Sequence, residues 1–245
     1  MAAYFLVITL LICSCSSSSK KGSLIGIDPS WYPLNSAGKE KNILGFSTDL
    51  LTEMTIRKRD NLAIYTASWD TLFSGLQSDV YQAVISSLPP YNFNTDLYDF
   101  SDIYLQTGPV LIVAFTSKTE TLSDLQGQEV GILLGSSAAN NLEKVPSIIV
   151  REYMAIPDML LALSSGTISG VVLDLLTAES YVQDLYLGRL KILFPVLQQE
   201  GLRLISLKGK APELISAFNE TLKDLKKEGK YPELLRKWSL ASSAP

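Results

Sequence analysis

Short apolar runs alternate along the first part of the chain with stretches whose apolar residues recur at helical spacing. The runs "SLIGID", "LAIYTAS" and "YQAVISS" have the length and residue types of strands. Between them lie "ILGFSTDLLTEMTIRKR" and "WDTLFSGLQSD", whose apolar residues would line one face of a helix. Strands and helices in this succession predict βαβ units and a parallel sheet.

The first of these helices carries an apolar stripe at Leu50, Leu51 and Met54. Ser47 and Thr48 precede the stripe, and a hydroxyl side chain can accept a hydrogen bond from the free backbone N–H groups at a helix start. We therefore expect one of these two residues to cap the helix.

The same alternation returns in the second part of the chain. "GPVLIVAFTS" is an unbroken apolar run, as expected for a strand buried on both faces. Strands are predicted over 129–134 and within "SIIVREY", a helix follows the corner "GSS", and "ISGVVLDLLTAESYV" reads as a strand that runs into a helix. Two amphipathic helices, separated at Gly229, end the pattern. The βαβ organisation thus occurs twice, on either side of about residue 106, which predicts an α/β protein of two lobes.

The composition excludes several kinds of chemistry. The 245 residues contain no histidine, which removes the commonest general base and metal ligand. The only cysteines are Cys13 and Cys15, so we expect no Cys-based metal site, internal disulfide or catalytic thiol in the body of the chain. We expect no metal and no cofactor. The net charge of −4 and the lack of a basic cluster argue against nucleic acid as a partner.

The N-terminal segment has the character of a targeting signal. "MAAYFLVITLLICSC" is apolar but shorter than the roughly 20 residues that span a bilayer. Its end resembles the lipobox of bacterial lipoproteins, which implies lipidation of Cys15, and "SSSSKK" would follow as a polar tether. The alternative is a buried N-terminal strand or helix, but a serine- and lysine-rich tether directly after it does not suit a position in the core. We expect a signal over 1–15 and a tether over 16–22.

Polar and aromatic residues gather where the predicted strands end. Ligands in parallel sheets collect at the carboxyl ends of the strands and between lobes. Taken singly, Asp174 would be a helix N-cap and Trp31 or Trp69 a core residue, whereas their joint placement favours a ligand site. The corners are "DPSWYP" (28–33), "SW" (68–69), "SSLPP" (86–90), "GSS" (135–137) and "LD" (173–174).

Seven segments, taken in order, carry a resemblance to a known family. They are "IGIDPSWYPLN", "ILGFSTDLLTEM", "SWDTLFSGLQSDVYQAVISSL", "YDFSDIYL", "LSDLQGQEVGILLGSS", "LSSGTISGVVLDLLTAESYV" and "LKKEGKYPELLRKW". Together they resemble the family 3 solute-binding proteins of amino-acid ABC transporters, which have the type II periplasmic-binding fold. The resemblance implies two lobes joined by two crossovers, with lobe 1 at 23–105 plus 199–245 and lobe 2 at 110–195.

The resemblance also implies which residues contact a ligand. Trp69 would wall off the ligand side chain, Ser136 and Ser137 would donate hydrogen bonds to a carboxylate, and Asp174 would accept an ammonium group. The full set of implied contacts is Asp28, Trp31, Trp69, Ser86, Ser87, Leu88, Asn94, Ser136, Ser137 and Asp174.

One departure from the family pattern falls in "AVISSLPPYNFN". The family places a carboxylate-binding arginine where Asn94 stands here, and no Lys or Arg occurs between Asp60 and Ser117. Three interpretations stay open. An amino acid could be held by Ser136, Ser137 and another donor such as Arg151 or Arg203, the ligand could be an amine or peptide without a carboxylate at this point, or binding could be lost.

The resemblance implies a monomeric solute-binding component of an ABC transporter. Its partners would be a small amino-acid-like molecule, permease subunits and, through a lipid anchor, the extracytoplasmic or periplasmic face of a bacterial membrane. Two alternatives share the fold. One is a ligand sensor without a role in transport, and the other is an enzyme like the cyclohexadienyl dehydratases, which the lack of histidine disfavours.

Overall fold

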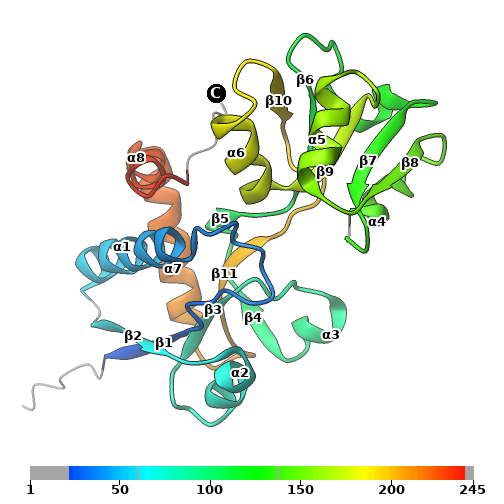
Figure 1. Cartoon of the computed structure of the whole chain (residues 1–245). Helices are drawn as coiled ribbons and strands as arrows, with labels where there is room; N and C mark the ends of the chain where they lie inside the picture. The colour runs from blue at the N-terminus through cyan, green and yellow to red at the C-terminus, as the bar shows by residue number, and fades with distance from the viewer. Residues whose placement is uncertain (1–21, 60, 137, 241–245) are drawn as a thin grey trace, which may run out of the picture.

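The computed structural model describes residues 22–240 except 60 and 137, and it shows two α/β lobes. Figure 1 shows the lobes side by side, each with a sheet flanked by helices, joined by extended segments near β5 and β11. The predicted two-lobe α/β fold is thereby confirmed. The predicted signal, with Cys13 and Cys15, and the predicted tether up to residue 21 lie outside the described residues. Within the described part of the chain, no helix is long and apolar enough to cross a membrane.

Lobe 1 contains residues from both ends of the described chain. Its elements are β1 (Ser23–Ile27), α1 (Glu40–Lys58), β2 (Leu62–Thr66), α2 (Trp69–Gln77), β3 (Ala83–Ser86), α3 (Asn92–Thr95), β4 (Tyr98–Phe100), β5 (Leu105–Gln106), β11 (Gly201–Leu207), α7 (Pro212–Lys227) and α8 (Lys230–Lys237).

Lobe 2 contains the residues between the two crossovers. Its elements are β6 (Pro109–Ala114), the 3₁₀ helix η1 (Leu122–Leu125), β7 (Glu129–Leu133), α4 (Ala139–Leu142), β8 (Ile149–Tyr153), α5 (Ile156–Ser164), β9 (Gly170–Asp174), α6 (Leu175–Asp184) and β10 (Leu190–Leu193).

The sheet of lobe 1 has the strand order β2-β1-β3-β11-β4, with β5 also paired to β11. The first three strands are parallel, as the βαβ pattern predicts, and β11 joins them antiparallel after the chain returns from lobe 2. This return brings Arg203 opposite Ser86, so that residues far apart in sequence share one strand end. Apolar residues of α1 and α7 cover one face of the sheet and those of α2 cover the other.

The sheet of lobe 2 has the strand order β10-β6-β9-β7-β8. Strands β7, β8 and β9 are parallel, whereas β6 is antiparallel to both of its neighbours. One face packs against α5 and α6 and the other against η1 and α4. The strand β9 ends at Asp174, and the first turn of α6 continues from it toward lobe 1, where Leu176 is part of the lobe 1 core.

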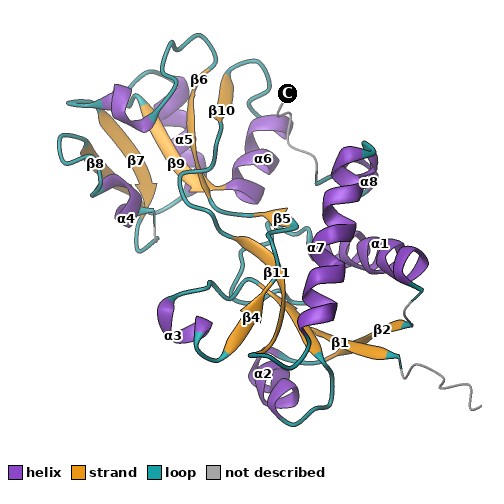
Figure 2. Ribbon diagram, turned by 180° about the vertical axis from the view of Figure 1, so that it is seen from behind, coloured by secondary structure: helices purple, strands orange, loops and turns teal. Residues whose placement is uncertain are grey.

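Two crossovers join the lobes and lie against each other. The backbone N–H groups of Thr107 and Gly108 donate to the carbonyl of Glu200 over 3.0 and 3.2 Å. A Cβ atom on Gly108 would lie 2.1 Å from the carbonyl oxygen of Gln198, and one on Gly201 would lie 2.2 Å from that of Leu105. Only glycine therefore permits this close approach. Figure 2, seen from behind, shows β5 and β11 at this junction.

The structure corrects two local expectations from the sequence. The helix α1 begins at Glu40, so Ser47 and Thr48 do not cap it but lie in its interior. The Ser47 hydroxyl donates to the carbonyl of Ile43 and is 2.6 Å from the Tyr104 hydroxyl, because a buried mid-helix serine needs partners within reach. The helix expected after "GSS" has only four residues, Ala139–Leu142.

Candidate ligand-binding site

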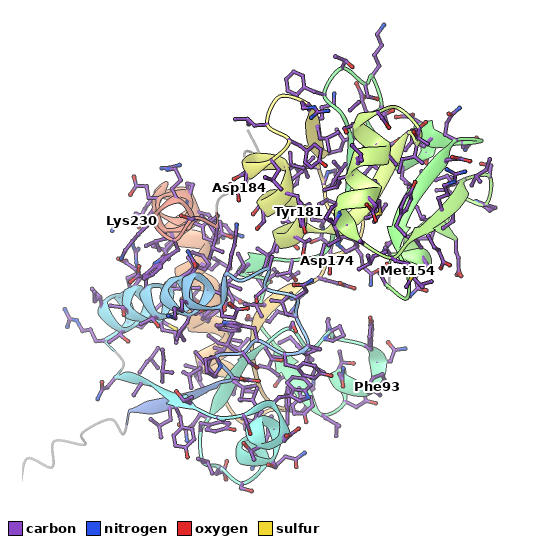
Figure 3. All side chains as sticks on the ribbon, in the orientation of Figure 1. Phe93, Met154, Asp174, Tyr181, Asp184 and Lys230 are labelled. Atoms are coloured by element: carbon purple, nitrogen blue, oxygen red, sulfur yellow. The ribbon has the colours of Figure 1, made fainter. Side chains whose placement is uncertain are left out.

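A cavity of about 220 Å³ lies between the lobes at the crossovers. In Figure 3, Asp174 lies where the two lobes meet, with Phe93 on lobe 1 and Met154 on lobe 2 to the same side of it. The cavity is therefore small, shared by both lobes, and suited to a small polar solute. It is lined by Pro33, Leu34, Asn35, Ser87, Pro89, Pro90, Thr107, Asp174, Gln199, Glu200, Gly201 and Arg203.

Asp174 is supplied to this cavity by lobe 2. It is the last residue of β9 and the N-cap of α6, in extended conformation, yet its side chain makes no capping hydrogen bond. The pairing of Pro109 with Asp174 fixes its backbone beside the first crossover. Burial raises the pKa of the Asp174 carboxyl, because a buried carboxylate loses solvation. Its carboxylate is thus available to a ligand cation, which would restore the lost stabilisation.

Glu200 approaches the same cavity from the second crossover. Its backbone carbonyl accepts two hydrogen bonds from the first crossover, which fixes its position at the junction. Burial raises the pKa of its carboxyl, and the negative charge of Asp174 raises it further. Two carboxylates therefore lie close enough in the cavity to repel each other.

Arg203 is the cation of the cavity. It lies on β11, next to Ser86 on β3, and its Nη1 donates to the carbonyl of Ser101 over 2.7 Å. Burial lowers the pKa of its guanidinium, and nearby Asp102 opposes that effect. An arginine has five N–H donors, so this one keeps donors free for a carboxylate. The other donor that the sequence suggested, Arg151, is exposed on β8 next to Glu129 and does not line the cavity.

The strand-end corner after β3 lies beside the cavity, but most of its polar groups are used locally. Ser87 lines the cavity. The Ser86 hydroxyl instead accepts a hydrogen bond from the backbone N–H of Leu88, which itself packs against the lobe 1 core. Asn94 is only 5% exposed and its Nδ2 donates to the carbonyl of Pro89 over 2.7 Å. Ser86, Leu88 and Asn94 therefore shape the corner from behind the cavity surface.

The corner after β1 also reaches the cavity, through residues other than those expected. The cavity wall comes from Pro33, Leu34 and Asn35. Asp28 does not line the cavity, because its carboxylate accepts hydrogen bonds from the backbone and hydroxyl of Ser30. Trp31 does not line it either.

Neither of the two tryptophans expected at the site reaches the cavity. Trp31 is 3% exposed in the lobe 1 core, where its Nε1 donates to the carbonyl of Glu40. Trp69 packs edge-on against Tyr32 and Phe73, and it is not among the lining residues. Aromatic side chains here stabilise the loop and the α2 face rather than the cavity wall.

The corner after β7 is separate from the cavity. The Ser136 hydroxyl is buried, and it has no hydrogen-bond partner among the described residues. It does not line the cavity, and Ser137 lies outside the described residues. Of the expected residues, Ser87 and Asp174 are brought together in one cavity, and Arg203, suggested as a replacement donor, joins them.

Sequence reasoning missed Glu200, Thr107 and the pair Leu34 and Asn35, which directly follow the predicted corner at 28–33. The signal for Glu200 was present, since an acidic residue directly precedes the strand that carries Arg203. It could not be placed without knowing that the two crossovers touch. Among the described residues no cluster of three His, Cys, Asp or Glu side chains could hold a metal ion.

A second cavity between the lobes, of about 450 Å³, is mostly apolar. Glu179 of α6 lines it and is 2% exposed, with its carboxylate 3.9 Å from the Nζ of Lys39 in lobe 1. Burial raises the pKa of Glu179 to about 7, and Lys39 opposes that effect. This acid is already paired across the lobes, in contrast to those in the first cavity.

Two α/β lobes, two touching crossovers and a charged cavity between the lobes define a two-lobe solute-binding protein of the type II periplasmic-binding fold. Residues 24–241 match the family described as bacterial extracellular solute-binding proteins, family 3. The chain belongs to this family.

Curated relatives match nearly the whole chain. The arginine-binding extracellular protein ArtP of Bacillus subtilis is 23% identical over 240 residues, which cover 94% of this chain and 93% of the relative. The lysine/arginine/ornithine-binding periplasmic protein of Escherichia coli is 26% identical over 254 residues, which cover 97% of each chain.

Solved structures show the same fold. The L-cystine solute receptor of Neisseria gonorrhoeae, in an unliganded open conformation, has a TM-score of 0.71 at 18% identity and covers 90% of this chain and 93% of its own. The second substrate-binding domain of a putative amino acid ABC transporter from Streptococcus pneumoniae has a TM-score of 0.68 at 24% identity, with 89% and 100% covered.

Proposed function

We propose that the protein is the extracytoplasmic solute-binding component of an ABC transporter and carries an amino acid or a similar small solute between its lobes. The observation that carries this proposal is the presence of Asp174 from lobe 2 and Arg203 from lobe 1 in one small cavity. An α-amino acid presents one cation and one anion a few bonds apart, which suits this pair of opposite charges. The names of both curated relatives, which refer to amino acids, support the same ligand class.

Arg203 would hold the ligand carboxylate and Asp174 the ammonium group. Arginine suits this role because its planar fork can donate two parallel hydrogen bonds to a carboxylate. Ser87, which lines the cavity, can add a hydroxyl donor. The missing family arginine at Asn94 would thus be replaced from a different strand, at a position that pairs with Ser86 of the same corner. This favours the first of the three interpretations of that departure.

Ligand binding would couple the two lobes, because its two charged ends would contact different lobes. Hinge closure about the crossovers would then remove the ligand from water and strengthen both ionic contacts. We propose the lobes as units at 23–105 plus 199–245 and at 110–195, with a monomer presenting the closed form to permease subunits.

We further propose that the chain is held at the membrane through lipid on Cys15. The support is the sequence alone, in which a short apolar signal ends at "ICSC" and a serine-rich tether follows. A single lipid chain gives only reversible binding, so the modification would have to supply more than one chain for stable anchoring.

A thermal-shift screen with the common amino acids, dipeptides and polyamines tests the proposed ligand class. Ligand binding to the native state raises the melting temperature with ligand concentration. We expect at least one free amino acid to do so and Arg203→Met to reduce that shift, since affinity for the carboxylate should fall by roughly 30-fold or more.

The matched control is Arg151→Met, which removes the same charge from an exposed site outside the cavity and should leave the shift unchanged. A protein stabilised only by polyamines, or an Arg203→Met variant with undiminished response to the amino acid, would contradict the proposal. Equal losses in both arginine variants would assign the effect to net charge.

A further inference from the structure

The charges lining the cavity do not balance for an ordinary zwitterion. The lining residues include two carboxylates, Asp174 and Glu200, and one guanidinium, Arg203. A zwitterionic ligand uses one carboxylate and the guanidinium, which leaves one negative charge in a cavity that closes away from water. Burying an uncompensated charge is costly, whereas a second cation on the ligand would compensate it.

We propose that Glu200 is a specificity-determining residue that binds a second cationic group of the ligand, so that the preferred solute is an amino acid with a positively charged side chain. This inference rests on the proposed function, since it assigns the α-ammonium to Asp174 and the carboxylate to Arg203.

The Glu200 carboxylate has no internal use that would explain it. Among residues 22–59, 61–136 and 138–240, no hydrogen bond or ion pair engages this carboxylate. Its backbone, by contrast, is bound to Thr107 and Gly108 of the other crossover. The backbone contacts therefore fix the position of Glu200, while its carboxylate has no partner among the described residues, as expected of a group that binds a ligand.

Glu179 shows what a structural acid looks like in the same hinge region. It is almost fully buried, it faces Lys39 across the lobes, and the other residues around its cavity are mainly apolar. Glu200 instead lies on the wall of the polar cavity with Asp174, and the negative charge of Asp174 raises its pKa beyond the effect of burial. Such repulsion between two acids is relieved when cations arrive.

The location of Glu200 also suits a specificity contact. It belongs to the crossover itself, next to Gly201, where a side chain on that glycine would meet the Leu105 carbonyl. Lobe closure pivots about the crossovers, so a side chain there keeps its distance to the ligand in open and closed forms better than one at the cavity rim. Discrimination between solutes would therefore begin in the open form.

Isothermal titration calorimetry with two probe pairs tests the inference. Arginine is compared with citrulline, its neutral counterpart of nearly the same shape, and lysine with norleucine, which lacks the side-chain ammonium. We expect the unmodified protein to bind the charged member of at least one pair tenfold or more tightly. Glu200→Gln should reduce that ratio to within about threefold, mainly by weakening the charged member.

The control variant is Glu143→Gln, which changes the same charge at an exposed position outside the cavity and should preserve the ratio. Equal affinities within both pairs, an unchanged ratio in Glu200→Gln, or an equal loss for both members of a pair would overturn the inference. The last result would show that Glu200 shares the α-ammonium with Asp174.

The failures of the two proposals are distinguishable. If neutral amino acids bind but charged members gain nothing, the proposed function stands and only the role of Glu200 is lost. If no amino acid binds in either experiment, both fail together.

Discussion

The two lobes contribute to the cavity in different ways. Lobe 2 supplies Asp174 directly at the end of β9, where strand, helix start and cavity coincide. Lobe 1 has an equivalent corner after β3, but there Ser86 and Asn94 bond to their own loop. Its cation comes instead from β11, the strand that returns from lobe 2.

If Arg203 holds the ligand as proposed, this corner keeps its place in the fold while its charged side chain comes from the adjacent strand. What a ligand meets is the set of side chains at one edge of the sheet, and antiparallel pairing puts Arg203 of β11 beside Ser86 of β3. A lost arginine on one strand can therefore be replaced from the adjacent one without a change of fold.

The strongest test of the comparison is Asp174→Ala in lobe 2. We expect affinity for any ammonium-bearing ligand to fall by about 100-fold or more, roughly 3 kcal/mol, because the ligand cation would be buried without a partner. Calorimetry measures this loss. Since burial raises the pKa of Asp174, binding by the unmodified protein should also weaken on acidification at a higher pH than for an exposed aspartate.

The control for that experiment is Asp158→Ala, which removes an exposed aspartate on α5, away from the cavity. An unchanged affinity in Asp174→Ala would show that lobe 2 does not supply the ammonium partner, and the contrast between the lobes would lose its basis.

A smaller effect on ligand affinity is expected from Glu179→Gln, which separates the role of Glu179 in α6 from that of Asp174 at the N-cap of this helix. Glu179 has a pKa of about 7 in place of 4.5, so its native form favours the proton more than the unfolded chain does. The native protein therefore loses stability as pH rises from about 4.5 to 7, by roughly 3 kcal/mol in all. We expect Glu179→Gln to be more stable than the unmodified protein by about that amount at pH 8, with little difference at pH 4.

Denaturant unfolding at the two pH values measures this difference, with Glu213→Gln, an exposed glutamate in the first turn of α7, as the control. A variant that is less stable at pH 8 would mean that the contact with Lys39 outweighs the burial of the charge. Ligand affinity should stay within threefold, unlike that of Asp174→Ala.

The smallest effect is expected from Asn94→Ala in lobe 1. Removal of the hydrogen bond to the Pro89 carbonyl should lower the free energy of unfolding by about 1 kcal/mol, because one part-buried hydrogen bond is lost while the backbone N–H of Tyr91 still donates to that carbonyl. Affinity should change by less than about threefold. Asn92→Ala, at an exposed position two residues earlier, is the control for both measurements.

An affinity loss in Asn94→Ala as large as that in Asp174→Ala would show that Asn94 contacts the ligand after all. The lobe 1 corner would then resemble the lobe 2 corner, and the proposed transfer of its chemistry to β11 would be unnecessary.

Much of the fold could be predicted from the sequence, because each parallel strand is an apolar run and each long helix has an apolar face. The strand predicted over 129–134 is β7 at Glu129–Leu133, for example. The start of α1 could not be predicted from its hydroxyl residues, because Ser47 bonds to Tyr104, which is 57 residues away in the sequence. The Ser47 hydroxyl thus takes part in a tertiary contact in the helix interior and not in a local cap at the helix start.

The lining of the cavity was predictable where the chain itself brings the residue to a strand end, as for Ser87 and Asp174. It was not predictable where two distant segments meet. Whether Trp31 faces the core or the cavity depends on the path of the loop after β1, and its Nε1 finds a backbone carbonyl on α1. The position of Glu200 at the cavity depends on the hydrogen bonds between the two crossovers, which the sequence does not reveal.

The contact between Gly108 and the carbonyl of Glu200 has a consequence for how the chain is organised. The chain leaves lobe 1 and re-enters it at nearly the same point, since these two positions are one hydrogen bond apart. Lobe 2 is therefore arranged as an insertion in lobe 1, and a short linker could join the two ends that it leaves. Without lobe 2, the described core of lobe 1 would lose Leu176, a buried side chain that comes from α6.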